Sequence, residues 1–255
     1  MKVTRAVVPS LFTVLNMFCG FLSIIAASRE EFVSASWFIA LAAVFDALDG
    51  VMARLTRSSS DFGVEIDSLS DVVSFGAAPA FLVYQIALFH LNGFGIVLSS
   101  MLMVFGGLRL ARFNVQLVGH DKDHFVGLPI PASALTVASF ILLYYDPAHG
   151  MPDRAASLLP WLAAGLSLLM VSKVKYDTLP RPTKRAIRKE PWKFVFLAIA
   201  IVVVAVTRGD AIFPLFVLFI ALGILRYIGS TVRHLLRSQE KLDEEDSAEP
   251  TRVDI

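Results

Sequence analysis

Apolar runs about as long as a bilayer is thick recur along this chain, and they constrain its fold more than any other feature. A helix of about 20 residues crosses a hydrocarbon core of about 30 Å. With 56% hydrophobic residues among 255, little of the chain is left for a soluble domain. The sequence therefore predicts an all-α, polytopic membrane protein, a helical bundle of about eight transmembrane helices. The predicted spans are residues 7–27, 32–55, 62–91, 95–117, 132–145, 158–174, 194–207 and 213–235.

Basic residues are distributed unequally between the two sides of these spans. Of the 23 Lys and Arg residues, all but Arg29, Arg154 and Arg208 fall on one side. The positive-inside rule then places both termini and this basic face in the cytoplasm, in an integral protein of the cytoplasmic membrane. Such a face suits anionic membrane lipid rather than a nucleic acid polymer. Residues 1–236 would form the transmembrane domain, and the acidic residues 237–255 a disordered cytoplasmic tail.

Four carboxylates interrupt the apolar pattern in the second and third predicted spans. Asp46 and Asp49 precede a short polar turn, and Asp67 and Asp71 follow it at matched distances. In an antiparallel hairpin all four lie at similar depth in the cytoplasmic half of the membrane. Each ionised side chain near the centre of a span costs about 2.5 to 3.5 kcal/mol, so the four acids need neutralising partners. A buried polar network linking helices is the alternative to a binding site.

Carboxylate oxygens in pairs are typical ligands of hard cations such as Mg²⁺ or Mn²⁺. Two such ions about 3.5 to 4 Å apart form a clamp for in-line displacement at phosphorus. The constellation therefore predicts a metal site for a phosphorylated substrate, at a depth that both a lipid and a water-soluble molecule can reach.

The spacing of these residues resembles the signature of the CDP-alcohol phosphotransferase family. The matching pattern is Asp46-x-x-Asp49-Gly50-x-x-Ala53-Arg54, eight further residues, then Gly63-x-x-x-Asp67-x-x-x-Asp71. Residues 9–20, 67–80, 108–114 and 127–132 are similar to the phosphatidylserine synthase branch of that family. The last three predicted spans resemble the family in hydropathy only.

This resemblance implies a six-helix core, a homodimer and a reaction in which CDP-diacylglycerol and L-serine give phosphatidylserine and CMP. It implies that the four aspartates hold two Mg²⁺ or Mn²⁺ ions. Asp71 would also be the catalytic base that accepts the serine hydroxyl proton. The residues implied on the nucleotide side are Gly50, Ala53, Arg54, Ser60 and Gly63.

Three residues near the end of the fourth predicted span are candidates for binding the acceptor or a phosphate. Arg109 and Arg112 have guanidinium groups that bind a carboxylate or phosphate through two hydrogen bonds. Asn114 can accept a hydrogen bond from the serine ammonium. Arginines at the cytoplasmic end of a span are also expected from topology alone. For Thr13 and Asn16, in the first span, helix packing is favoured over substrate contact.

Two other functions remain open at this point. The same fold and metals could serve another alcohol acceptor, glycerol 3-phosphate or inositol phosphate, although these need more positive charge near the site. An ion-coupled transporter could use the same aspartates, but transporters commonly have inverted repeats and broken helices near the midplane. The sequence has no recognisable repeat.

Overall fold

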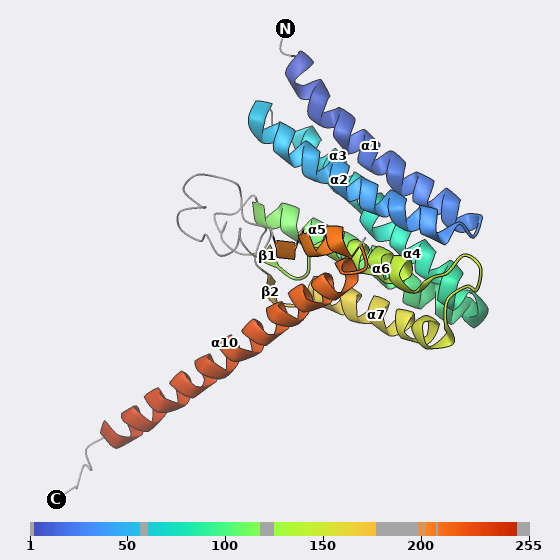
Figure 1. Cartoon of the computed structure of the whole chain (residues 1–255). Helices are drawn as coiled ribbons and strands as arrows, with labels where there is room; N and C mark the ends of the chain where they lie inside the picture. The colour runs from blue at the N-terminus through green and yellow to red at the C-terminus, as the bar shows by residue number, and fades with distance from the viewer. Residues whose placement is uncertain are drawn as a thin grey trace, which may run out of the picture.

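The computed structural model describes residues 3–56, 61–117, 125–176, 199–200, 202–207 and 209–248, and it is almost entirely helical (Figure 1). The α-helices are α1 (Val3–Ser28), α2 (Phe32–Thr56), α3 (Asp61–Asp71), α4 (Ala78–Val83), α5 (Asn92–Leu117), α6 (Ile130–Tyr144), α7 (Asp153–Val171) and α10 (Ile212–Ala248). The other elements are the π-helices η1 (Val72–Ala77) and η2 (Tyr84–Leu88), the 3₁₀-helix η3 (Phe89–Leu91), and the short strands β1 (Phe125–Val126) and β2 (Lys175–Tyr176).

Four stretches of the described residues are long and apolar enough to cross a membrane. The second of them has 54 residues and reverses direction at Asn92, which adopts a left-handed φ of 50°. Helix α5 therefore returns beside α4 (Figure 1). The helical membrane architecture is confirmed, whereas the count of eight spans remains a prediction. The stretches are Leu11–Ser28, Phe62–Val115, Asp153–Val171 and Ile212–Arg233.

The predicted third span is not a regular α-helix throughout. After Asp71 the backbone widens into η1, and the Ala78 N–H bonds to the Val73 carbonyl, five residues back. Pro79 follows directly and has no N–H to donate, so a regular α-helical ladder would be interrupted here in any case. A π-turn absorbs this interruption while the helix continues. The carboxylates therefore lie immediately before a local change in helical pitch.

Serine hydroxyls attach α1 to the helix that carries Asp67 and Asp71. Ser70 donates to the Thr13 carbonyl at 3.0 Å, and Ser74 donates to the Asn16 carbonyl at 2.8 Å. Both serines are fully buried. Gly20 allows this close approach, because a Cβ there would lie 2.6 Å from the Ser74 Cα. The position of α1 beside the carboxylates is thus determined by buried polar contacts and by one small residue.

Strands β1 and β2 pair antiparallel and connect the segment before α6 to the segment after α7. Gly127 has a left-handed φ of 88°, and a Cβ there would collide with the Met170 carbonyl oxygen. Helix α6 begins at Ile130, two residues before the predicted start, and includes Pro131 in its first turn. A proline is tolerated there because first-turn N–H groups have no partner within the helix.

Helix α10 extends into the acidic residues of the predicted tail, and the disorder of that tail stays a prediction. It continues to Ala248 and projects from the bundle (Figure 1), so residues 237–248 are helical and residues 249–255 lie outside the described part. Glu, Lys, Gln, Arg, Leu and Ala dominate this segment, and all of them favour helix. Because it extends an existing helix, the segment avoids the cost of nucleation.

Replacing Gly20 with Ala should destabilise the protein, because the new methyl group would push α1 away from Ser74. Overpacking of this kind costs about 1 to 3 kcal/mol. Gly165→Ala is the matched control, since a Cβ at that helical position meets nothing within 4 Å. Thermal unfolding in detergent should give a lower midpoint for Gly20→Ala and an unchanged or higher one for Gly165→Ala. Equal midpoints for the two variants would contradict the close α1 contact.

Candidate active site

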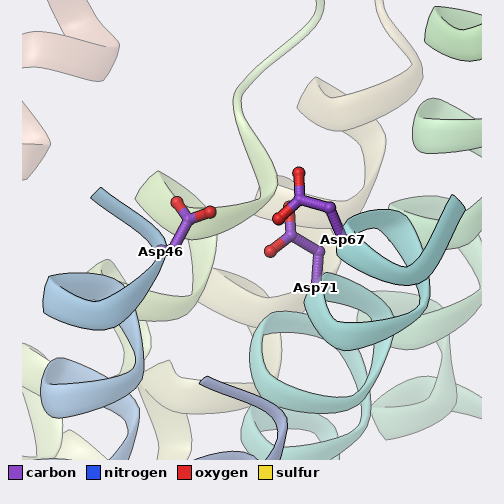
Figure 2. A group of neighbouring side chains, drawn as sticks. All are labelled: Asp46, Asp67 and Asp71. Atoms are coloured by element: carbon purple, nitrogen blue, oxygen red, sulfur yellow. The ribbon is translucent and has the colours of Figure 1, made fainter. Parts of the chain in front are cut away.

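Three carboxylates from two helices converge on one point. Asp46 extends from α2, and Asp67 and Asp71 extend from α3 toward it (Figure 2). One oxygen from each can be chosen so that all lie within 4.8 Å of one another. Asp71 is buried, and Asp46 and Asp67 are half-buried. Like charges so close in a poorly hydrated site repel strongly, so the arrangement calls for a positive partner.

Arg109 of α5 supplies a positive charge beside Asp71. Its side chain is only 8% exposed, and it lies close enough to Asp71 for the two charges to interact. The Nε atom is buried and has no hydrogen-bond partner among the described residues. One guanidinium cannot neutralise three carboxylates. Among the described residues, the site therefore retains an excess of negative charge and one buried donor without a partner.

Asp49 points in a different direction from the other three aspartates. Its Oδ2 accepts a hydrogen bond of 2.9 Å from the Thr13 hydroxyl on α1, and its Oδ1 is buried with no partner among the described residues. Residues three apart on a helix differ by about 60° in direction, since each residue turns the helix by about 100°. This is enough for Asp46 to face the cluster while Asp49 faces α1.

Asn16 contributes a contact that sequence reasoning missed. Its side chain has no exposed surface, and Nδ2 lies 3.4 Å from Asp71 Oδ1. Thr13 and Asn16 therefore contact two of the candidate ligand carboxylates, where the sequence favoured helix packing over substrate contact. The signal was present, because two polar residues three apart on an apolar helix share a face.

The carboxylates open onto a large cavity of about 780 Å³. Its polar lining includes the three clustered aspartates together with Ser68, Arg109 and Asn114 from α2, α3 and α5, and Tyr176 from β2. The opposite wall is almost wholly apolar and comes from the start of α6, the start of α10 and Val204. A charged cluster and an apolar wall in one cavity suit an amphipathic ligand. The apolar residues on this wall include Pro129, Ile130, Leu135, Ile212, Leu215, Phe216 and Phe219.

The structure separates the three candidate acceptor residues. Arg109 and Asn114 line the cavity, whereas Arg112 is exposed and is not among the lining residues. Asn114 Nδ2 donates to the Ser68 hydroxyl at 3.0 Å. Positions 109 and 112 differ by about 60° around the helix axis, which is enough to place one arginine side chain inside the cavity and the other outside.

The candidate nucleotide residues lie nearer the turn between α2 and α3. Gly50, Ala53 and Gly63 are half-buried and Arg54 is exposed, while Ser60 lies outside the described residues. None of the four described positions lines the cavity. A nucleotide on these residues would therefore extend from the carboxylates toward the turn, away from the apolar wall.

The chemistry of the donor set fits a hard divalent cation. The cluster offers carboxylate oxygens, and no His or Cys joins them among the described residues. Magnesium and manganese prefer such oxygens. The buried Asp49 Oδ1 has no hydrogen-bond partner among the described residues, so it is a further carboxylate oxygen that a cation could use.

Comparison with known proteins places this fold and site in one family. The family model described as CDP-alcohol phosphatidyltransferase matches residues 6–169, which include all four aspartates and Arg109. The chain belongs to this family of membrane enzymes.

Two relatives and one solved structure illustrate what the chain is similar to. The CDP-diacylglycerol–serine O-phosphatidyltransferase of Helicobacter pylori strain J99 is 35% identical over 223 residues, which cover 86% of this chain and 90% of the relative. The archaetidylserine synthase of Methanothermobacter thermautotrophicus is 38% identical over 179 residues, covering 69% and 72%. The phosphatidylinositol phosphate synthase of Mycobacterium tuberculosis, solved with CDP-DAG bound, has a TM-score of 0.52 at 20% identity. That match covers 64% of this chain and 81% of the neighbour, and it supports the fold alone.

Asn16→Leu should weaken divalent metal binding without unfolding the protein. The change removes the hydrogen bond to Asp71, and losing such an outer contact typically costs about 10- to 100-fold in metal affinity. It also removes the buried Asn16 Oδ1, which has no hydrogen-bond partner among the described residues, so the stability of the protein should change little. Titration of the purified protein with Mn²⁺ measures the effect.

Ser36→Ala is the control for this measurement. Ser36 is fully buried, but its hydroxyl bonds only to the Phe32 carbonyl in its own helix. Mn²⁺ affinity should be unchanged in this variant. Unchanged affinity in Asn16→Leu as well would support the helix-packing interpretation of Asn16.

Proposed function

We propose that this enzyme transfers the phosphatidyl group of CDP-diacylglycerol to the hydroxyl of L-serine, giving phosphatidylserine and CMP. The observation that carries the proposal is the cluster of Asp46, Asp67 and Asp71 beside an apolar wall in one cavity. Similarity to a serine phosphatidyltransferase over 86% of the chain supports this choice of reaction.

Asp46, Asp49, Asp67 and Asp71 would hold two Mg²⁺ or Mn²⁺ ions, which offset the charge of the diphosphate when bound. The excess negative charge of the cluster and the buried Asp49 Oδ1 support this assignment. Thr13 and Asn16 orient Asp49 and Asp71 from α1. Gly50, Ala53, Arg54, Ser60 and Gly63 would bind the nucleotide, near the turn.

Asp71 acts as the base in this proposal. Its carboxylate takes the proton of the serine hydroxyl while the serine oxygen attacks the phosphorus on the lipid side of the diphosphate. The bond from that phosphorus to the bridging oxygen breaks, and CMP leaves with the electron pair. A serine hydroxyl is a weak nucleophile, so a base within hydrogen-bond reach is needed. Burial of Asp71 and its contact with Asn16 hold it in one orientation.

Arg109 binds an anionic group of a substrate, either the serine carboxylate or a donor phosphate. Its buried position in the cavity and its Nε, which has no partner in the described part of the chain, support this role. The amide oxygen of Asn114 would accept a hydrogen bond from the serine ammonium, while Nδ2 donates to Ser68. Arg112, being exposed, would meet lipid headgroups or water instead of bound acceptor.

The arrangement in the membrane extends the same proposal. Residues 1–236 form a catalytic domain of about eight transmembrane helices around a six-helix core, in the cytoplasmic membrane and as a homodimer. Both termini and the active site face the cytoplasm, where serine and CMP are soluble. The excess of Lys and Arg on one side of the predicted spans supports this orientation.

Another acceptor, glycerol 3-phosphate or inositol phosphate, is the alternative. A phosphorylated acceptor brings about two negative charges to a site that is already acidic. Arg109 is the only Lys or Arg among the described residues lining the cavity, which favours serine. Purified enzyme given CDP-diacylglycerol, Mn²⁺ and each labelled alcohol should form lipid product from serine. Product from a phosphorylated alcohol and none from serine would reject the proposal.

Asp71→Asn should abolish transfer while leaving the protein folded. Removing a general base typically lowers turnover by about 10²- to 10⁴-fold. Asp46→Asn and Asp49→Asn should raise the Mn²⁺ concentration needed for activity as well. Asp153→Asn, at an exposed position in the first turn of α7, should have no effect. Full activity in Asp71→Asn would contradict its role as base.

Arg109→Lys should reduce catalytic efficiency much more than Arg112→Lys. A lysine keeps the charge but loses the forked guanidinium, so the effect isolates two-point binding of an anion. The expected loss for Arg109→Lys is about tenfold or more, since hydrogen bonds to charged groups contribute about 1.5 to 3 kcal/mol. Separate KM values for serine and CDP-diacylglycerol identify the bound group. Equal effects of the two substitutions would contradict the separation of Arg109 from Arg112.

A further inference from the structure

Tyr176 lines the cavity from a part of the fold that the signature does not cover. It is the last residue of β2 and is held by pairing with Phe125 of β1. Its ring lies 5.5 Å from that of Phe219 and packs over Gly223 on α10. A Cβ at Gly223 would lie 2.6 Å from the tyrosine Cδ1, so the ring occupies space that only glycine leaves free. The phenol is therefore rigidly placed.

The hydroxyl of Tyr176 is buried without a hydrogen-bond partner among the described residues. The whole side chain is 4% exposed. A phenylalanine would fill the same space without leaving a polar atom unpaired, so the hydroxyl carries a cost that packing does not explain. Burial raises the pKa of Tyr176 to about 12, so at neutral pH the phenol stays protonated and can donate a hydrogen bond.

The surroundings of Tyr176 select an uncharged acceptor. Its aromatic neighbour is Phe219, and the wall on that side of the cavity is apolar. A carboxylate or phosphate bound there would need a positive partner, and the cavity-lining cation, Arg109, is assigned beside Asp71. A carbonyl oxygen needs only one donor. In a diacylglycerol lipid, the ester carbonyls lie between the phosphate and the acyl chains. The apolar wall lies beside the carboxylate cluster in the same cavity, so a donor with its diphosphate at the cluster would have its ester carbonyls near this wall.

We propose that the Tyr176 hydroxyl donates a hydrogen bond to an ester carbonyl of the lipid donor and so makes the enzyme prefer ester-linked over ether-linked donors. This inference rests on the proposed function. The two relatives named above support a specificity element on the lipid side, because their names share serine and differ in the lipid group. Tyr176 is a positioning residue for the donor and takes no part in proton transfer.

The test compares two donors that differ only in the ester carbonyls. CDP-diacylglycerol and a CDP-dialkylglycerol of equal chain length are bound to purified wild-type protein and to Tyr176→Phe in detergent. The wild type should bind the ester donor about 3- to 10-fold more tightly, the range for one neutral hydrogen bond. Tyr176→Phe should lose most of this preference by weakening ester binding, and its affinity for the ether donor should be unchanged.

Two controls separate this role from a structural one. Tyr145→Phe changes a tyrosine that packs against Phe32 and does not line the cavity, so it should keep the donor preference. The thermal midpoint of ligand-free Tyr176→Phe should equal or exceed that of the wild type, because an unpaired buried hydroxyl is removed. A lowered midpoint together with equal weakening of both donors would assign Tyr176 a structural role and overturn the proposal.

Failure of this inference is distinguishable from failure of the proposed function. No donor preference in the wild type, or an undiminished one in Tyr176→Phe, would overturn the inference even if serine is the acceptor. A Tyr176-dependent preference in a protein that transfers nothing to serine would leave the inference standing and reject the proposed acceptor.

Discussion

The structure depends on holding three carboxylates together where water is scarce. Asp46, Asp67 and Asp71 repel one another, and the protein provides Arg109 as partial compensation. The carboxylates stay together only if the contacts that hold the surrounding helices in place outweigh this electrostatic repulsion. The buried serine contacts between α1 and the helix of Asp71 supply that rigidity, since polar groups inside an apolar bundle are costly to separate from their partners.

The same helices divide the cavity into two chemical regions. Helices α2 and α3 bring the three carboxylates and α5 brings Arg109 and Asn114, whereas α6 and α10 bring aliphatic and aromatic side chains to the cavity. A lipid with a charged head group needs both regions in one cavity, because the head group requires charged or polar partners and the acyl chains require apolar ones. The short β1–β2 pair adds a third component, since it places one phenol on the apolar side.

The π-helix after Asp71 illustrates how a local constraint serves the site. Pro79 has no N–H, so it interrupts the series of α-helical hydrogen bonds. The wider turn of η1 accommodates this missing hydrogen bond without ending the helix. Ser74, Phe75 and Gly76, all within this turn, are buried. Ser74 meets Asn16 of α1 and Gly76 lies against Met103 of α5, so the altered pitch coincides with the contacts that position both neighbouring helices.

Much of the fold follows from the sequence, because hydropathy in a bilayer leaves the backbone little choice but helix. The helical architecture and the aspartate motif were readable from apolar runs and spacing, whereas most of the predicted span 194–207 lies outside the described residues. For the acidic tail, composition predicts disorder, whereas the good helix formers among residues 237–248 continue an existing helix.

The sequence by itself determined that acids at helical spacing lie within a helical membrane protein, because period and hydropathy are local properties of the chain. Only the tertiary structure decided which side chains share the site. It turned Asp49 toward Thr13, brought Asn16 to Asp71, and put Arg109 inside while Arg112 stayed outside. It also brought Tyr176 of β2, far along the chain from the aspartates, to the cavity. These outcomes depend on the rotation of each helix about its axis and on contacts between segments far apart in sequence, which spacing alone does not specify.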